Sequence, residues 1–140
     1  MYLFDTDVLS NVVKKAPSAV LLARLTDLPG DMQFTTAINA AEIYYGAARS
    51  EHREEILKAF EEKVFPGLTI LPFDAGSAKV YGALKASLER KGTVRSEPDL
   101  RIAAIAIQRR LTLVTGNVRH FEAIPGLRVE DWINPFDSPA

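Results

Sequence analysis

Short apolar segments alternate with helical segments along this chain, and this alternation limits its fold more than any other feature of the sequence. The apolar segments that we expect to be strands are residues 2–4, 33–36, 68–71, 111–115 and 127–129. Segments with helical spacing lie between them. Because strands that alternate with helices form a parallel sheet covered on both faces, the sequence predicts an α/β fold of three layers, with a short parallel sheet of about five strands flanked by helices.

The expected helices are marked by their end signals as well as by their spacing. They cover residues 17–28, 37–49, 51–64 and 74–90, and a last one starts at Pro98. Asp74 is a suitable N-cap, Gly92 ends that helix, and Pro98 suits a first helical position because its missing N–H has no partner there. The apolar face that we expect for the 37–49 helix consists of Ala37, Ala41, Tyr44, Tyr45 and Ala48. The two tyrosines would then be core or dimer contacts.

The composition fits a single domain. With 140 residues, of which 47% are hydrophobic and 25% charged, the chain can bury one core and is too hydrophobic to be disordered. We expect one domain over residues 1–133 and a tail over residues 134–140. No apolar run approaches the roughly 20 residues that span a bilayer, and acids interrupt the amino terminus, so we expect a cytoplasmic protein with no membrane partner. The absence of cysteine excludes thiolate metal sites and cysteine nucleophiles.

The net charge of −1 hides an uneven distribution of charge. Residues 79–119 contain nine Lys or Arg and three Asp or Glu, whereas residues 1–75 contain seven and eleven. Such a basic segment can bind phosphates, or it can consist of solvated helix faces, and composition alone favours the second interpretation.

Four oxygen-bearing side chains lie where strands end or helices begin. Asp5 follows the first strand, Glu42 lies on the helix after the second, Asp99 lies in the first turn of a helix, and Asn117 follows the fourth strand. Ligands of a parallel sheet bind beyond the carboxyl ends of its strands, so one crevice can gather all four. Clustered carboxylates repel each other unless a cation compensates, and Mg²⁺ and Mn²⁺ prefer oxygen ligands. The sequence therefore predicts a divalent-metal site, although helix capping alone can explain single acids such as Asp5 or Asp99.

Four motifs carry a family resemblance that covers nearly the whole chain. They are Asp5-Thr6-Asp7-Val8-Leu9, residues 36–46 (TAINAAEIYYG), residues 99–106 (DLRIAAIA) and residues 113–121 (LVTGNVRHF). With these motifs in this order, the chain resembles the PIN-domain ribonucleases of the VapC toxin type. The resemblance implies a PIN-like fold and an Mg²⁺-dependent endoribonuclease, with Mn²⁺ as the alternative ion, that cuts tRNA or another structured RNA. It also implies a homodimer and a small VapB-like antitoxin that neutralises it.

We expect roles for ten side chains, and the resemblance assigns those of Asp5, Glu42, Asp99 and Asn117. The expected catalytic residues are Asp5, Glu42, Asp99 and Asn117, of which the first three bind the metal and the last occupies the family's fourth acidic position. The expected supporting residues are Thr6, Asp7 and Thr115, and the expected RNA contacts are Arg95, Arg101 and Arg119. For the threonines and arginines the alternatives are backbone hydrogen bonds and solvated surface. We expect hydrolysis to leave 5′-phosphate and 3′-hydroxyl ends, and an antitoxin arginine to inhibit it by replacing the charge of the metal.

Three positions depart from the family pattern. Asn117 is an amide where many relatives have aspartate, which removes a charge from the site. Asp7 stands where asparagine is frequent, so it either restores that charge or hydrogen-bonds the following loop. His120 occupies a position often held by an acid, and a surface histidine and a phosphate contact are both open interpretations.

Other function classes stay open. The segment from Asp5 to Val8 also resembles the start of haloacid-dehalogenase-type phosphatases, in which the first aspartate is the nucleophile. That mechanism and a response-regulator receiver both need a later lysine, and no lysine follows Lys91. The non-enzymatic alternative is a PIN-like module that binds RNA or protein without cutting, and the amide at Asn117 supports it.

Overall fold

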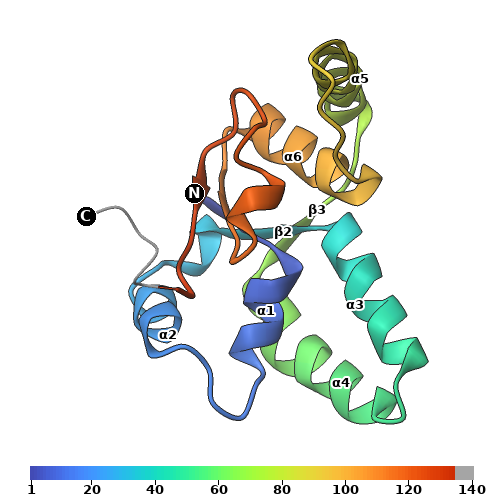
Figure 1. The fold of residues 1–140 in the computed structure, drawn as a ribbon. Helices are drawn as coiled ribbons and strands as arrows, with labels where there is room; N and C mark the ends of the chain where they lie inside the picture. The colour runs from blue at the N-terminus through green and yellow to red at the C-terminus, as the bar shows by residue number, and fades with distance from the viewer. Residues whose placement is uncertain (135–140) are drawn as a thin grey trace.

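The computed structural model describes residues 1–134, and its centre is a five-stranded parallel sheet with the order β3-β2-β1-β4-β5 (Figure 1). The strands are β1 (Tyr2–Phe4), β2 (Gln33–Thr36), β3 (Thr69–Leu71), β4 (Thr112–Val114) and β5 (Val129–Glu130). Leu3 of β1 is in register with Phe34 on one side and Leu113 on the other. The chain adds β2 and β3 on one side of β1 and then returns to add β4 and β5 on the other. The carboxyl ends of β1 and β4 are therefore a topological switch point, where sheets of this kind bind ligands.

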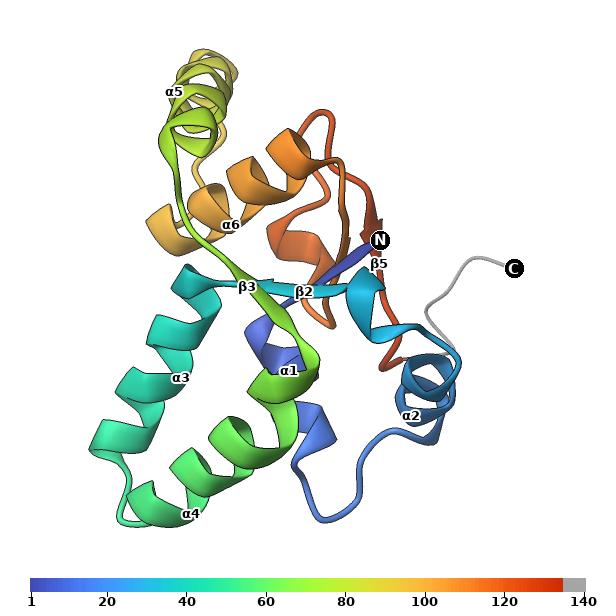
Figure 2. The ribbon, with the colours of Figure 1, turned by 180° about the vertical axis from the view of Figure 1, so that it is seen from behind.

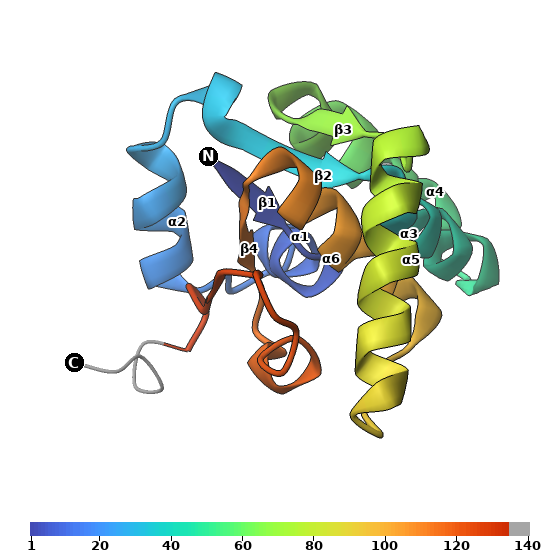
Figure 3. The ribbon, with the colours of Figure 1, turned by 90° about the horizontal axis from the view of Figure 1, so that it is seen from above.

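Helices cover both faces of the sheet, which confirms the predicted three-layer α/β architecture. They are α1 (Thr6–Val12), α2 (Ala19–Thr26), α3 (Ala37–Arg49), α4 (Arg53–Ala59), α5 (Ala75–Arg90) and α6 (Glu97–Arg109). Figures 1 and 2 show α5 and α6 on one side of the sheet and α1 to α4 on the other. Seen from the α5–α6 side in Figure 3, α6 crosses over the central strands.

Each face of the sheet has its own hydrophobic core. Leu3 and Leu113 pack with α5 and α6, while their neighbours Phe4 and Val114 pack with α1, α2 and Trp132 on the opposite face. This alternation follows from the two-residue period of a strand. Burial of each large apolar side chain contributes about 1.5–3 kcal/mol, so both layers hold the central strands firmly and fix the positions of their carboxyl ends.

The helix-end signals act as expected, with one shift. Asp74 Oδ1 accepts a hydrogen bond from Ser77 N at 2.9 Å and caps α5, and Gly92 ends that helix with a φ of 70° that favours glycine. Ser96 caps α6, whose first residue is Glu97. Pro98 is therefore the second helical residue and not the first.

Four elements differ from the prediction by more than one residue at an end. α1 was not expected; it forms because Asp5 caps it by accepting a hydrogen bond from Thr6 N at 2.9 Å. The expected 51–64 helix is α4 followed by one π-helical turn at Phe60–Val64. Phe60 and Val64, the first and last residues of that turn, are buried in the core. α2 is shorter than residues 17–28 by two residues at each end, and β5 starts two residues later than expected.

The buried face of α3 was predicted wrongly. The buried residues are Asn39, Ala40, Ile43 and Ala47, whereas the five residues expected to be buried, including Tyr44 and Tyr45, are exposed. Alanines occur on both sides of this helix, so hydrophobicity alone does not set which side faces inward. In the observed orientation of α3, Asn39 faces inward and makes the hydrogen bonds described below. The tyrosines are not core residues, and their role as dimer contacts stays a prediction.

Within residues 1–134, no helix is both long and apolar enough to cross a membrane. The predicted tail begins at Asn134, and residues 135–140 lie outside the described part of the chain.

Candidate active site

Asp5 lies at the centre of a hydrogen-bond network at the carboxyl ends of β1 and β4. Its side chain is buried, and its two oxygens accept hydrogen bonds from three elements. Oδ1 accepts from Thr6 N at 2.9 Å and from Asn39 Nδ2 at 3.0 Å, and Oδ2 accepts from Thr115 Oγ1 at 2.8 Å. These donors stabilise the charged form of a carboxylate that burial would otherwise neutralise.

Asn39 is a site residue that the sequence analysis missed. It is fully buried in the first turn of α3, where its Oδ1 accepts from Thr36 Oγ1 at 2.6 Å. Its Nδ2 also donates to Thr6 Oγ1 at 3.1 Å, and Thr6 Oγ1 donates to Glu42 Oε1 at 3.2 Å. Asn39 and Thr6 thus connect Asp5 to Glu42. The available signal was an asparagine three residues after a helix-capping threonine, on the same stripe as Ile43 and Ala47.

Asp7 and Asn117 form a second part of the network. Asp7 Oδ2 accepts from Gly116 N at 2.8 Å and from Asn117 Nδ2 at 3.3 Å. Thr115 Oγ1 accepts from Asn117 N at 3.0 Å while it donates to Asp5. The structure therefore brings all three expected supporting residues, Thr6, Asp7 and Thr115, into contact with the expected catalytic ones.

Asp99 enters the site from α6. It lies in the first turn of that helix, as expected, and its Oδ2 is 3.5 Å from His120 Nδ1. Its negative charge is close enough to raise the pKa of both Asp5 and Glu42. The contact between His120 and Asp99 was not expected from the sequence.

Three acids of this site, Asp5, Asp7 and Glu42, have no cationic partner in the described part of the chain. Burial raises the pKa of Asp5, Asp7 and Glu42 above their ordinary values, and the charges of neighbouring acids raise them further. Among the described residues, Asp5, Asp7 and Glu42 take part in no ion pair with lysine, arginine or histidine. Within residues 1–134, no three of the acidic or histidine side chains are already arranged as a metal-binding group. Among the described residues, Asp5, Asp7 and Glu42 therefore concentrate negative charge without a lysine, arginine or histidine partner.

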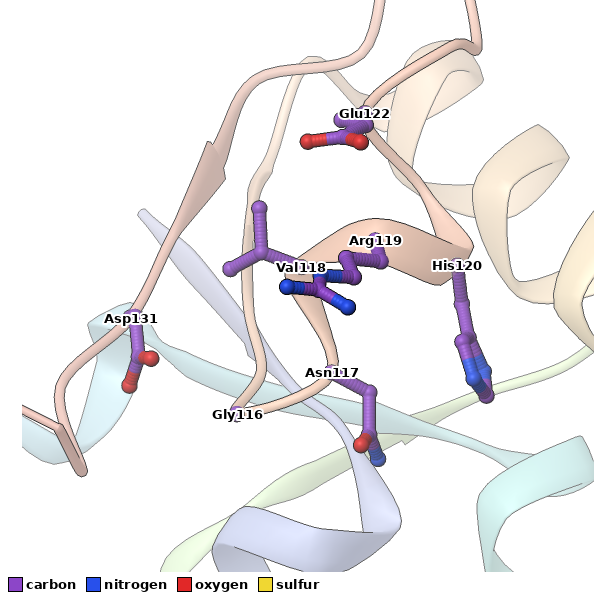
Figure 4. Close-up of a pocket in the computed structure, with 7 residues that line it drawn as sticks. All are labelled: Gly116, Asn117, Val118, Arg119, His120, Glu122 and Asp131. Atoms are coloured by element: carbon purple, nitrogen blue, oxygen red, sulfur yellow. The ribbon is translucent and has the colours of Figure 1, made fainter. Parts of the chain in front are cut away.

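A pocket of about 550 Å³ opens beside this network. Its lining residues are Gly116, Asn117, Val118, Arg119, His120, Glu122 and Asp131 (Figure 4). Figure 4 shows the Arg119 guanidinium inside the ring of labelled residues, with Asn117 extending from the loop toward the start of α1. An arginine next to clustered acids is suited to a substrate that carries phosphate groups.

Arg95 and Arg101 do not line this pocket. Arg101 is 3.7 Å from Glu97 and lies over the ring of Tyr81, and Arg95 borders a smaller pocket beside Lys85 and Glu97. Of the three arginines expected to contact RNA, the structure places only Arg119 beside the acidic network.

The fold and the site together define the class of protein. Residues 2–127 match the PIN domain family, so the chain belongs to that family. Its fold also matches single chains of solved structures. One is VapBC2 from Rickettsia felis bound to a promoter DNA fragment (TM-score 0.86, 31% identity, 94% of this chain and 98% of that chain). Another is FitAcB from Neisseria gonorrhoeae (TM-score 0.83, 29% identity, 99% and 100%).

Sequence relatives narrow the class further. The chain is 36% identical to ribonuclease VapC2 of Haemophilus influenzae (strain Rd) over 94% of this chain and 98% of that one. It is 34% identical to the tRNA(fMet)-specific endonuclease VapC of Salmonella typhimurium, over 94% and 97%. Within the PIN domain family, the protein is thus a ribonuclease of the VapC group.

Proposed function

We propose that this ribonuclease is an Mg²⁺-dependent endonuclease for structured RNA, that it acts as a toxin, and that an antitoxin encoded as a separate chain neutralises it. The observation that carries this proposal is the cluster of Asp5, Glu42 and Asp99, whose charges repel one another and have no lysine or arginine partner in the described chain. A divalent cation is the partner that would compensate them.

The residues of the site fit a divalent metal. Asp5, Glu42 and Asp99 would hold it, because carboxylate oxygens are the ligands that Mg²⁺ and Mn²⁺ prefer. The raised pKa of Asp5 and Glu42 supports this assignment, since a cation would lower both again. Within residues 1–134 these acids are not yet arranged as a finished metal-binding group.

The protein's own groups would orient the reaction. When bound, the cation would supply positive charge to the scissile phosphate and lower the pKa of an attacking water. Thr6 and Asn39 hold the Glu42 and Asp5 carboxylates in fixed positions, and Thr115 orients the second oxygen of Asp5. Arg119 would hold a neighbouring phosphate in the adjacent pocket. Hydrolysis by water would leave 5′-phosphate and 3′-hydroxyl ends.

The preference for RNA would come from shape and groove contacts, because this reaction does not use the 2′-hydroxyl. The Salmonella relative is named for its action on initiator tRNA, which makes tRNA the first substrate class to test.

The antitoxin would bind along an apolar groove that begins at the acidic site. This α1–α4 groove has a volume of about 490 Å³ and is lined by Thr6, Ser10, Val13, Glu42, Ile43, Gly46, Ala47, Ser50, Ile56 and Phe60. An amphipathic segment of the antitoxin could cover its apolar part and place an arginine at Glu42. A solved neighbour from Mycobacterium tuberculosis, named as a member of the VapBC family of toxin–antitoxin systems, supports a partner of this kind. We also expect a homodimer, for which the exposed Tyr44 and Tyr45 are candidate contacts.

The remaining alternative is a PIN-like module that binds RNA without cutting it. The amide of Asn117 supports this alternative, because it supplies one charge fewer than the family's usual acid. The match of residues 2–127 to the PIN domain family leaves the phosphohydrolase and receiver alternatives without support.

The test is cleavage of initiator and elongator tRNAs by the wild type and by Asp99→Asn, each with Mg²⁺, Mn²⁺ or EDTA. We expect cleavage only with a metal and a loss of at least about 100-fold in the variant, the order of magnitude for losing one charged transition-state interaction. Glu97→Gln is the matched control, because Glu97 lies in the same helical turn but pairs with Lys85. RNA binding without cleavage under every condition would instead establish the binding module.

A further inference from the structure

Asp7 ties the loop after β4 to the first turn of α1. Its Oδ2 accepts two hydrogen bonds from that loop, at 2.8 Å from Gly116 N and at 3.3 Å from Asn117 Nδ2. The two segments are more than 100 residues apart in the chain, and β1 and β4 bring them together as neighbours. Asp7 therefore controls where the loop that carries Asn117 lies relative to Asp5.

The position of Gly116 shows how close this contact is. A Cβ added there would lie 2.8 Å from Asp7 Oδ2 and 3.2 Å from Ile133 Cδ1. The backbone of Gly116 is not left-handed, so glycine is needed here for space and not for conformation. The loop is thus shaped to let the Asp7 carboxylate reach its backbone.

The charge of Asp7 determines the orientation of the Asn117 amide. An ionised carboxylate only accepts hydrogen bonds, so the amide nitrogen has to face Asp7. Within residues 1–134, no group donates a hydrogen bond to the amide oxygen of Asn117. The backbone of Asn117 is fixed as well, because its N–H donates to Thr115 Oγ1, which in turn donates to Asp5. The loop that carries this oxygen is thereby tied to Asp5 through Thr115, with the amide nitrogen and not the oxygen on Asp7.

We propose that Asp7 is a positioning residue that orients Asn117, so that the amide oxygen of Asn117 serves as a further oxygen ligand of the cation. This inference rests on the proposed metal-dependent function. Asp7 then provides one negative charge, and Asn117 provides one oriented amide oxygen.

The pair makes an exchange experiment possible. Asp7→Asn leaves two amides; the new side chain has to use its oxygen for Gly116 N–H, so its nitrogen faces Asn117 and draws the amide oxygen away from the cation. Asn117→Asp leaves two carboxylates with no donor between them. The double variant restores one carboxylate and one amide in the reverse order, with the amide at position 7 donating to the carboxylate at position 117.

The measurements are Mn²⁺ titration by calorimetry, RNA cleavage, and thermal unfolding of the metal-free protein, for the wild type, both single variants and the double variant. We expect Asp7→Asn to weaken Mn²⁺ binding about 10-fold or more, as is typical when a group that orients a ligand is lost. The kcat should fall to a similar degree while the KM for RNA stays within about twofold. The double variant should recover both values to within about threefold of the wild type. Asp31→Asn, the same change at an exposed position before β2, is the control and should alter neither.

A double variant that binds Mn²⁺ more tightly than both single variants supports the proposal, because neither the carboxylate at position 117 nor the amide at position 7 alone then accounts for the recovery. Wild-type Mn²⁺ affinity in Asp7→Asn, or a double variant no better than Asp7→Asn, would overturn it. The metal-free unfolding midpoints separate this inference from the proposed function. If the wild type cut no RNA, the proposed function would fail. The orientation of Asn117 by Asp7 would still be tested by stability: a double variant more stable than Asn117→Asp alone would support it, and a double variant no more stable than Asn117→Asp would overturn it.

Discussion

Thr115 has one hydroxyl group, and the site uses both its donor and its acceptor capacity. The hydroxyl donates to Asp5 Oδ2 and accepts from Asn117 N, so a single side chain links a metal-binding candidate to the loop of the fourth site residue. Because Thr115 is fully buried, water cannot replace either bond. The hydrogen bond to Asp5 also opposes the rise in pKa that burial causes.

Thr115→Val should therefore shift the pH dependence of cleavage. Without the hydroxyl, the pKa of Asp5 rises further, so the loss of activity on the acidic side should begin at a higher pH. Stability should also fall by about 1–3 kcal/mol, because buried partners lose their hydrogen bonds. The pH profile of RNA cleavage and chemical unfolding would measure both effects.

Thr35→Val is the matched control for this change. Thr35 is equally buried, and its hydroxyl donates to the backbone Phe4 O at 2.9 Å and not to a carboxylate. It should lower stability without moving the pH profile. If Thr115→Val left the acidic side of the pH profile of RNA cleavage unchanged, the hydroxyl of Thr115 would not set the pKa of Asp5.

At the residue scale, the sequence was informative where a side chain stood in a recognisable motif. Asp5, Glu42, Asp99 and Asn117 were selected in this way, and hydrogen bonds or charge interactions link them in the structure. Asn39 was missed because a buried amide depends on partners from other elements, and Thr6 and Asp5 are remote from it in the chain. The role of Asp7 stayed open for the same reason, since its partners lie beyond β4.

At the element scale, α3 serves two sides of the molecule. Asn39 and Glu42 reach the acidic site near its start, and Ile43, Gly46 and Ala47 line the α1–α4 groove further along. A Cβ added at Gly46 would meet no atom within 4 Å, so this position leaves the groove open.

Gly46→Leu should fill the groove and weaken neutralisation by the antitoxin at least about 10-fold. Leucine also favours a helix over glycine by roughly 0.5–1 kcal/mol, so the fold should not suffer. The measurement is the inhibition constant of the antitoxin, taken relative to each variant's own uninhibited RNA cleavage. Gly82→Leu is the control, because Gly82 is a helical glycine on α5 with equally open surroundings and does not line the groove. Equal inhibition of both variants would place the antitoxin elsewhere.

The order of strands and helices was predictable, but their finer features were not. Apolar runs and cap residues such as Asp74 act locally, so they can be read from neighbouring residues. The start of α1, the π-helical turn at Phe60–Val64 and the inward side of α3 depend on contacts with distant segments. Local patterns carry no information about such contacts.

At the scale of the whole molecule, the small net charge conceals a concentration of acids at one edge of the sheet. Asp5, Asp7 and Glu42 have raised pKa values, so the folded protein binds protons at these groups more tightly than the unfolded chain does. Asp74 and Glu97 behave in the opposite way: hydrogen bonds with Ser77 and with Lys85, respectively, lower their pKa.

These directions predict how the stability of the metal-free protein depends on pH. The contribution of the three site acids is complete below their ordinary pKa values, near 4, and is lost as the pH rises through their raised values. The contribution of Asp74 and Glu97 is lost only as the pH falls below about 4. We therefore expect the unfolding midpoint in EDTA to fall from pH 5 to pH 7, by roughly 4 °C for each kcal/mol of repulsion, and Mg²⁺ to reverse this fall at pH 7.

Thermal unfolding across this range, in EDTA and in Mg²⁺, would measure the effect. Glu42→Gln should flatten the dependence in EDTA, because it removes one of the three acids. A midpoint that stays level or rises from pH 5 to pH 7 without metal would contradict the charge balance described here.

The residues of the α1–α4 groove come earlier in the chain than some residues of the active site, so they are synthesised first. All residues that line the groove lie between residues 6 and 60, whereas the site also needs Asp99 and Asn117. A ribosome therefore makes every residue of the surface that we assign to the antitoxin before it makes the last groups needed for cutting RNA. The folded groove still depends on Val114 and Trp132, which pack with α1 and α2 and are made later.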